Sequence, residues 1–210
     1  MRYYIADCHF FHEALNREMD HRGFASVEEM NEYMIKRWNE KVRNRDEVVI
    51  LGDLSMGNAE QTNALLDRLQ GKLFLIVGNH DNRYLRSKTF HKERFGWIYP
   101  YAELHDDGRK VVLSHYPIAC YNGQYLKNKK GGPRTYMLYG HVHDTMDQRL
   151  IEQFSDITRS TVRTGRDGKE IHIPCNMINC FCMYSDYTPL TLDEWIICDK
   201  ERREQYGKRS

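Results

Sequence analysis

The feature that most constrains the fold is an alternation of short apolar runs with longer amphipathic segments. Three of the runs are rich in β-branched and aromatic residues and are bounded by turn residues, as buried strands are; they span residues 3–6, 47–51 and 72–77. The segments between them carry helical periodicity. A succession of strand, helix, strand, helix and strand predicts an α/β layered fold with a mixed sheet.

Both intervening helices have start signals. Ser26 and Glu29 form a capping box, and Asn58 with Gln61 offers a similar start for the second helix. After Ser26, apolar residues recur at helical spacing, at Val27, Met30, Met34 and Trp38. This stripe is expected to pack in the core rather than to form a site.

The second half of the chain offers further elements. Strands are expected at 110–113, 135–139 and 174–183, with a mixed region at 144–160 and a hairpin at the turn Arg166-Asp167-Gly168-Lys169. Thr191 with Glu194 caps a final helix, whose charged end at 199–203 is expected to face solvent. Because no repeat or linker interrupts the pattern, the sequence predicts one domain over residues 1–210.

Composition excludes several classes of protein. Lys and Arg total 31 against 30 Asp and Glu, so no global basic field gathers nucleic acid; a nucleic-acid partner is possible but not favoured. The chain has no extended apolar leader and no apolar run of membrane-spanning length, which predicts a soluble, cytoplasmic protein. Oligomeric state cannot be read from these features.

Two segments carry residues that permit alternative interpretations. The six cysteines are expected to be reduced thiols, and Cys180 and Cys182 would share one face of the strand at 174–183, as buried hydrophobes or as metal ligands. The stretch 121–134, with three lysines and Gly131-Gly132, is either a solvated surface loop or a loop that contacts substrate.

Five short polar segments stand directly after apolar runs. They are Asp7-Cys8-His9, Gly52-Asp53, Gly78-Asn79-His80-Asp81, Ser114-His115 and Gly140-His141-Val142-His143. Ligands of open α/β sheets bind outside the carboxyl ends of the strands, so these segments are expected to converge. The glycines are expected to let the backbone turn sharply where each strand ends.

The donors in these segments share one chemistry. Imidazole nitrogen with carboxylate and amide oxygen, and no thiolate, suits divalent Mn, Fe, Co, Ni or Zn. Seven donors exceed what one ion uses when water positions stay open: Asp7, His9, Asp53, Asn79, His115, His141 and His143. Two ions sharing a carboxylate account for the number, and a pair roughly 3.5 to 4 Å apart is usual in phosphoester cleavage.

The ordered set D-x-H, G-D, G-N-H-D, H and G-H-x-H resembles the signature of the calcineurin-like metallophosphoesterase family. Two longer segments, Asp7-Cys8-His9-Phe10-Phe11-His12 and Ser114-His115-Tyr116-Pro117, are similar to those of its small bacterial and phage-type members. The resemblance covers nearly the whole chain. It implies a four-layer α/β/β/α sandwich with two mixed sheets, two divalent metal ions with Mn favoured, and hydrolysis of a phosphate ester.

The resemblance also implies a role for each donor. Asp7, His9 and His143 would bind one ion, Asn79, His115 and His141 the other, with Asp53 bridging them. A hydroxide shared by the ions would attack phosphorus in line. Two divalent ions, two carboxylates and one hydroxide leave a formal charge of about +1, which attracts a phosphate anion.

His80 stands in the same motif but is not needed as a ligand. The resemblance makes it the general acid or charge stabiliser at the leaving oxygen, and Asp81 could orient its ring through the other nitrogen. An isolated loop histidine would more often be structural.

Weaker candidates lie beside the motifs, each with a structural alternative. His12 and Asn16 either contact substrate and ligands or make hydrogen bonds at a helix start. Tyr116 and Tyr121 either line the cleft or pack, and Lys127 and Arg134 either meet an anionic substrate or are solvated.

The substrate expected is a small phosphodiester or phosphomonoester, with diesters slightly preferred. Gly52-Asp53 continues as Leu54-Ser55-Met56-Gly57, without the second acid and the arginine that follow this block in protein Ser/Thr phosphatases, so that activity is doubtful. Two alternatives stay open: a nuclease acting on short strands or ends, and a noncatalytic protein-binding scaffold of the same fold.

Overall fold

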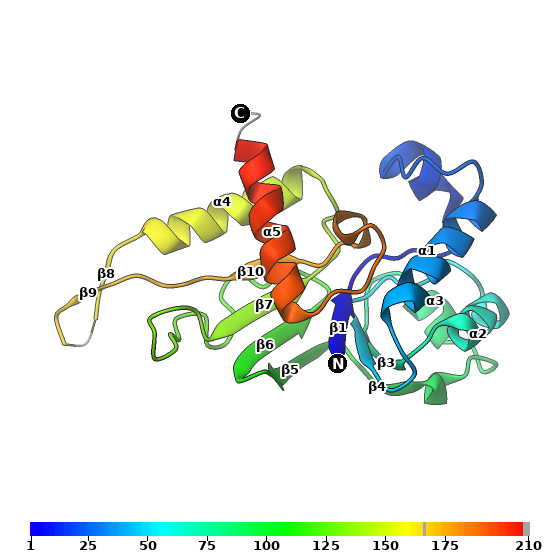
Figure 1. Cartoon of the computed structure of the whole chain (residues 1–210), viewed down its shortest axis with the longest axis horizontal. Coiled ribbons are helices and arrows are strands. Elements are labelled where there is room, and N and C mark those ends of the chain that lie inside the picture. The colour runs from blue at the N-terminus through cyan, green and yellow to red at the C-terminus, as the bar shows by residue number, and fades with distance from the viewer. Residues whose placement is uncertain (166, 208–210) are drawn as a thin grey trace.

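Four parallel strands form the first sheet. In the computed structural model (Figure 1), which describes residues 1–165 and 167–207, its order is β1-β2-β3-β4. These strands are β1 (Arg2–Ile5), β2 (Glu47–Ile50), β3 (Lys72–Ile76) and β4 (Phe95–Tyr99). The three strands predicted in this half of the chain are confirmed, and β4 was not predicted.

The second sheet is mixed, with the order β10-β7-β6-β5. It contains β5 (Tyr101–Asp106), β6 (Arg109–Ser114), β7 (Thr135–Tyr139) and β10 (Met177–Asn179). Only the β5–β6 pair is antiparallel, because a tight turn joins these two strands. The expectation of two mixed sheets is therefore wrong for the first sheet, in which all three strand pairs are parallel.

The helices begin largely where the caps indicate. They are α1 (Val27–Lys41), α2 (Ala59–Arg68), α3 (Asn82–Leu85), α4 (Met146–Ser160) and α5 (Leu192–Gly207), with short turns η1 (Leu15–Met19), η2 (Lys92–Arg94) and η3 (Cys182–Ser185). Asn58 and Gln61 form a reciprocal capping box, and Thr191 with Glu194 does the same. Among the described residues, no helix combines the length and apolar character needed to cross a membrane.

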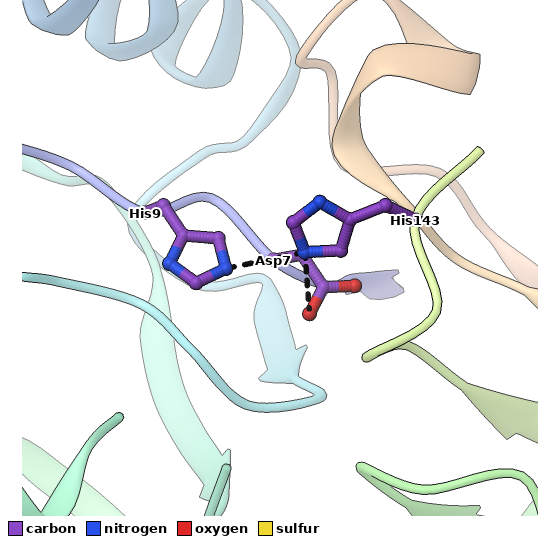
Figure 2. Close-up of side chains that lie close together, drawn as sticks. All are labelled: Asp7, His9 and His143. Carbon is purple, nitrogen blue, oxygen red and sulfur yellow. Dashed lines mark hydrogen bonds and ion pairs between the residues drawn. The ribbon is translucent and has the colours of Figure 1, made fainter. Parts of the chain in front are cut away.

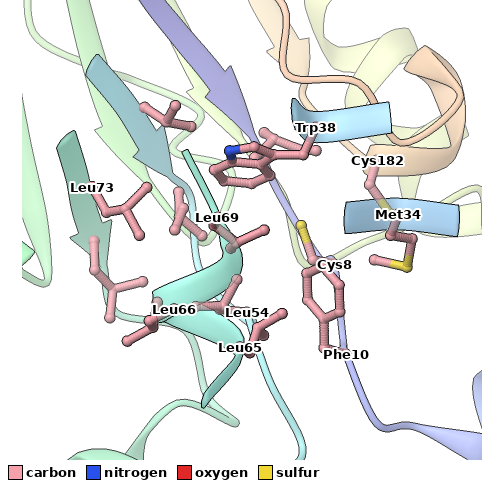
Figure 3. Packing of buried hydrophobic residues seen from close by; sticks show 14 of the residues in the cluster. Cys8, Phe10, Met34, Trp38, Leu54, Leu65, Leu66, Leu69, Leu73 and Cys182 are labelled. Carbon is pink, nitrogen blue, oxygen red and sulfur yellow. The ribbon is translucent and has the colours of Figure 1, made fainter. Parts of the chain in front are cut away.

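Alternation along the strands builds four layers. Tyr3 and Ile5 of β1 belong to one buried cluster with residues of α1 and α2, while Tyr4 belongs to another with residues of the second sheet. Figure 3 shows part of the first cluster, including Trp38 of α1 and Leu65 of α2. On the second sheet, Leu138 points into the layer between the sheets and Met137 points toward α4. Because successive side chains of each strand point to opposite faces, the first sheet packs against α1 and α2 on one face and against the second sheet on the other, and the second sheet packs against α4. These four layers confirm the α/β/β/α sandwich.

The segment predicted as a strand at 174–183 instead changes sheets. β10 ends at Asn179, and the amide of Cys180 still donates to Tyr139 O of the second sheet. The amide of Cys182 donates instead to Ala6 O, which directly follows β1 of the first sheet. Cys180 and Cys182 therefore lie in different environments, both buried and unbonded to another sulfur. The structure thus favours the interpretation of these cysteines as buried hydrophobes over that as metal ligands.

Two other expectations concern the C-terminal half. A hairpin does form, from β8 (Arg163–Thr164) and β9 (Glu170–Ile171), although Arg166 of its turn lies outside the described residues. The charged end of α5 does not simply face solvent, because Arg202 is buried and pairs with Glu152 of α4 and with Asp199. Its charge ties α5 to α4, a contact that local periodicity does not encode.

Candidate metal centre

All five polar segments converge, and both sheets contribute to the meeting point. Asp7 and His9 follow β1, Asp53 follows β2, and Asn79 follows β3. His115 follows β6, while His141 and His143 follow β7. The carboxyl ends of strands from both sheets therefore open onto one site, as expected for a ligand site of an α/β fold.

Asp7, His9 and His143 form what we call the first group. The Nε2 atoms of His9 and His143 lie 3.3 Å apart, and His143 Nε2 lies 3.8 Å from Asp7 Oδ1. Figure 2 shows the two rings and the carboxylate turned toward one another. All three are nearly or fully enclosed by the protein. Their donor atoms are close enough together to share one ion.

Asp53, His115 and His141 form the second group, which Asn79 joins. His115 Nε2 lies 3.0 Å from Asn79 Oδ1 and 3.4 Å from Asp53 Oδ2. The same Asp53 oxygen lies 3.6 Å from His9 Nε2 of the first group. Asp53 thus stands between the groups, where a bridging carboxylate has to lie.

The donor spacing suits divalent cations. Ligands about 2.1 Å from a tetrahedral or octahedral ion stand roughly 3.0 to 3.5 Å from one another. The shortest separation between donor atoms is 3.3 Å in the first group and 3.0 Å in the second. His115 Nδ1 donates to Leu51 O at 2.8 Å, which turns Nε2 toward the site, where it can bind a cation once its proton is displaced. The residues present therefore fit two cations of the class expected from the sequence.

Backbone strain concentrates at the donors. Asp7, His9, Asp53, His141 and His143 all have positive φ, between 47° and 73°. This left-handed conformation is uncommon for residues other than glycine, and strained backbone of this kind clusters at functional sites. These five residues all carry donor atoms of the two groups.

The glycines of the motifs serve two different purposes. Gly52 has φ +90° and turns the chain as expected. Gly78 and Gly140 do not adopt positive φ; instead, a Cβ at Gly78 would lie 2.2 Å from Asp53 Oδ1, and one at Gly140 would lie 2.5 Å from Asp7 Oδ2. At these two positions glycine is needed because a carboxylate of the site occupies the space of a side chain.

Charge is distributed unevenly among the donors in the metal-free protein. Burial alone would lower the pKa of His115, but the hydrogen bond that its ring donates to Asp53 and the charge of Asp7 outweigh it and raise that pKa to about 9. Burial opposes ionisation of Asp53 as well, yet His115 holds its pKa at about 2. Burial raises the pKa of Asp7 to about 6, and burial lowers the pKa of His9. A cation at His115 must therefore displace a proton.

The predicted contact between Asp81 and the His80 ring is not found. The buried Asp81 carboxylate instead accepts from the amides of Asp53, Leu54 and Gly78 and from the hydroxyl of Tyr84, at 2.7 to 2.9 Å. Four donors occupy the acceptor positions of its two oxygens. Asp81 is therefore a positioning residue for the Asp53 loop.

His80 lies at the open side of the site. Its amide donates to Asp53 Oδ1, its Nε2 is 4.0 Å from Asp53 Oδ2, and 42% of its side chain is exposed. The ring packs at the edge of the His9 ring, with centroids 5.4 Å apart. His80 lines a cavity of about 250 Å³ together with several of the donors.

Two residues that support the first group were missed in the sequence. Asp20 Oδ1 accepts from His143 Nδ1 at 2.7 Å, and its other oxygen pairs with Arg22 at 2.9 Å. The Arg22 guanidinium is buried and also donates to the carbonyls of Asp7 and Cys8. Asp20 precedes His143 by 123 residues, so no local spacing could have identified the pair.

The weaker candidates separate into different environments. His12 lines the metal cavity, and its Nδ1 accepts from the Leu15 amide at the start of η1, so the helix-start hydrogen bond is present. Asn16 bonds both backbone groups of Phe24. Tyr116 packs edge-on against His141, with ring centroids 4.5 Å apart.

The stretch 121–134 gives no support to a substrate contact. Tyr121 is buried and bonds Asn176, and Lys127 lines a separate cavity beside Arg159. Arg134 joins β-type backbone pairing, its amide donating to Leu126 O. The residues that line the metal cavity come from other segments.

Comparison with known proteins places the motifs in a wider group. A family model described as calcineurin-like phosphoesterase matches residues 3–176, which include all seven donors. An uncharacterized protein of Methanocaldococcus jannaschii is 35% identical over 143 residues, 67% of this chain and 68% of that protein. The Gene 66 protein of Mycobacterium phage L5 is 28% identical over 170 residues, 69% of this chain and 78% of that protein.

A solved structure shares the fold. The crystal structure of a protein of unknown function from Aquifex aeolicus superposes with a TM-score of 0.63 at 21% identity, covering 92% of this chain and 96% of that one. At this identity the likeness concerns the architecture of the chain and not its substrate.

Proposed function

Because this chain belongs to the calcineurin-like phosphoesterase family, we propose that it hydrolyses a small phosphodiester or phosphomonoester with the help of two divalent cations. The observation that carries the proposal is the position of Asp53, whose Oδ2 lies within 3.6 Å of a ring nitrogen from each donor group. A carboxylate placed in this way serves two ions at once.

Each group would hold one cation. Asp7, His9 and His143 would bind the first, and Asn79, His115 and His141 the second, with Asp53 shared. When bound, the pair supplies Lewis-acid chemistry, which lowers the pKa of water and neutralises charge on the phosphate. Manganese is favoured from the nitrogen and oxygen donor set, although Fe, Co, Ni and Zn share these preferences.

His80 is the residue positioned to act on the leaving group of the substrate. His80 is held by its amide at Asp53 while its ring stays accessible in the cavity. In this position it can deliver a proton to the leaving oxygen of the substrate. Proton delivery matters most for an alkoxide leaving group, which favours diesters slightly over monoesters.

A direct assay tests the proposal. Purified protein loaded with Mn should hydrolyse both bis-p-nitrophenyl phosphate and mono-p-nitrophenyl phosphate, the diester faster, with metal content measured on the same sample. Absence of turnover of either substrate, with two equivalents of Mn bound, would overturn the proposed function.

His80 gives a sharper test of the mechanism. With a dialkyl phosphate, whose leaving group is an alkoxide, His80→Ala should lower kcat roughly a hundredfold, within the usual range for a general acid, and should leave Mn content intact. With the p-nitrophenyl esters, whose leaving group departs without a proton, the loss should be small. His91→Ala, at an exposed histidine outside the donor groups, is the matched control and should keep full activity. Loss of Mn from His80→Ala would show that His80 acts on the metals instead.

The two other candidate functions have less support. A noncatalytic scaffold does not need seven donors drawn together with an accessible histidine beside them. A nuclease acting on short strands or ends remains chemically possible, and retention on single-stranded DNA at physiological salt would raise its standing.

A further inference from the structure

A second, larger cavity lies beside the metal cavity. It has a volume of about 510 Å³ and is formed by η1 with the loop after it, by η3 and by α5. Met19 lines both cavities, so the two meet at this side chain. We call the larger one the acidic cavity, after the three carboxylates in its lining, Asp20, Asp144 and Glu201.

A row of rings leads from the site of reaction to the acidic cavity. His80 packs against His9 at 5.4 Å, His9 against His143 at 5.1 Å, and His143 stacks on Phe181 at 4.7 Å. Phe181 in turn meets Tyr184, and both line the acidic cavity. His143 also bonds Asp20 of its lining. The acidic cavity therefore begins where the first donor group ends.

The charges of the lining are mostly balanced, with one exception. Asp20 pairs with Arg22, and Asp144 pairs with Arg149. Arg202 is committed to Glu152 and Asp199 and lies over the Tyr184 ring. Glu201, by contrast, is exposed, and no ion pair holds it within the part of the chain that the structure describes. Among the described residues of the lining, its carboxylate is the one without a cationic partner.

This lining suits one kind of group. Arg202 already covers one face of the Tyr184 ring and His143 one face of Phe181, so the uncompensated carboxylate of Glu201 supplies the attraction for a further cation. The metal cavity has the opposite preference, because two divalent cations attract the phosphate anion. A single substrate that satisfies both cavities carries negative charge at the phosphate and positive charge further along.

We propose that the acidic cavity binds a protonated amine carried by the ester group that remains on phosphorus. This inference rests on the proposed function and names its substrate class as amine-bearing phosphodiesters. Hydrolysis breaks the bond between phosphorus and the leaving oxygen, while water supplies a hydroxyl to phosphorus and a proton to that oxygen. The amine is unchanged and serves only in recognition, with Glu201 as the specificity residue.

Matched substrates test the proposal. One series is p-nitrophenyl ω-aminoalkyl phosphates with two to six methylenes, and its control is the p-nitrophenyl n-alkyl phosphates of equal length. At one or two lengths the amine should raise kcat/KM about tenfold, mainly through a lower KM, and the advantage should shrink as salt is raised. Equal kcat/KM values at every length would overturn the proposal.

Charge reversal identifies the residue. Glu201→Lys should abolish the advantage of the amine, measured within that variant as the ratio of kcat/KM between the amine and alkyl series. Glu204→Lys makes the same change of charge on the same helix, at an exposed residue outside the cavity lining, and should keep the advantage. An advantage that survives in Glu201→Lys, or falls equally in both variants, contradicts the assignment.

Two different results separate amine recognition from hydrolysis itself. Hydrolysis of the alkyl series without any amine preference sinks only the acidic cavity as a recognition site. Failure to hydrolyse either series with Mn bound sinks the phosphodiesterase itself.

Discussion

The two donor groups differ in what lies behind them. The first group is backed by a buried ion pair, because His143 bonds Asp20 and Arg22 holds Asp20 together with the carbonyl of Asp7. The second group ends at His141, which is exposed and is flanked by a half-exposed tyrosine, Tyr116. One half of the centre is supported by the interior of the protein and the other borders solvent.

This difference bears on how tightly each half holds a cation. Partners that orient a liganding histidine raise its basicity and reduce the entropy lost on binding. The first group has such partners in Asp20 and Arg22, whereas His115 of the second group is oriented by a neutral carbonyl, Leu51 O. We therefore expect the first group to bind its ion more tightly and to exchange it more slowly.

The largest effect is expected at Asp53, because this residue serves both donor groups. Asp53→Asn takes the shared carboxylate from both groups, so both ions should bind weakly or be lost, and kcat/KM should fall at least about a thousandfold, equivalent to about 4 kcal/mol. Metal analysis after gel filtration, paired with the diester assay, measures both. A variant that retains two tightly bound Mn ions would contradict the bridging role.

A second variant should affect one group alone. Asp20→Asn keeps the shape of the side chain but removes the charge that faces His143 and Arg22, which should weaken one of the two Mn sites roughly 10- to 100-fold. Titration calorimetry resolves the two sites. Asp186→Asn, which changes a carboxylate paired with Arg37 away from the centre, is the matched control and should bind both ions normally.

On metal removal, the second group should lose its ion before the first. When Mn-loaded protein is mixed with excess chelator, one equivalent should leave about tenfold faster than the other, because ligand exchange begins at the exposed His141 side. Asp20→Asn should accelerate only the slow phase. A single phase for both ions in the native protein would show that the two halves do not differ kinetically.

The smallest effect concerns the metal-free protein. The pKa of His115 is raised from 6.5 to about 9, so its pairing with Asp53 stabilises the fold fully below about pH 6.5 and is lost as pH rises through 9. The pKa of Asp53 is lowered from 3.8 to about 2, so its contribution is present above about pH 3.8 and is lost as pH falls through 2.

The melting temperature of metal-free protein, measured across this pH range, should therefore be highest between the two limits. His115→Gln should flatten the alkaline decline. If the decline is the same in that variant, another group causes it.

Much of the architecture could be predicted from the chain because the signals are local. The strands that precede Asp7, Asp53 and Asn79 are short apolar runs, and the caps at Ser26 and Asn58 lie at the true starts of α1 and α2. These patterns act between neighbours in sequence, so they survive without knowledge of the fold.

Other features were missed because their causes lie far apart along the chain. The segment after Asn179 leaves the second sheet in order to bond Ala6, so it ends as a strand earlier than its apolar composition suggested. Arg202 is buried because Glu152 of another helix stands opposite it. A charged residue in a helix is normally solvated, and only the partner reverses that expectation.

Local sequence is enough to place the seven donor side chains at the ends of strands, because each motif directly follows an apolar run. What these side chains and their neighbours face depends on how distant segments pack, as with Asp20 behind His143 and the backbone amides around Asp81. The physical reason is that a hydrogen bond or a shared cation depends on distance in space. Asp7 and His143 come close enough to share a cation only after the two sheets have packed together.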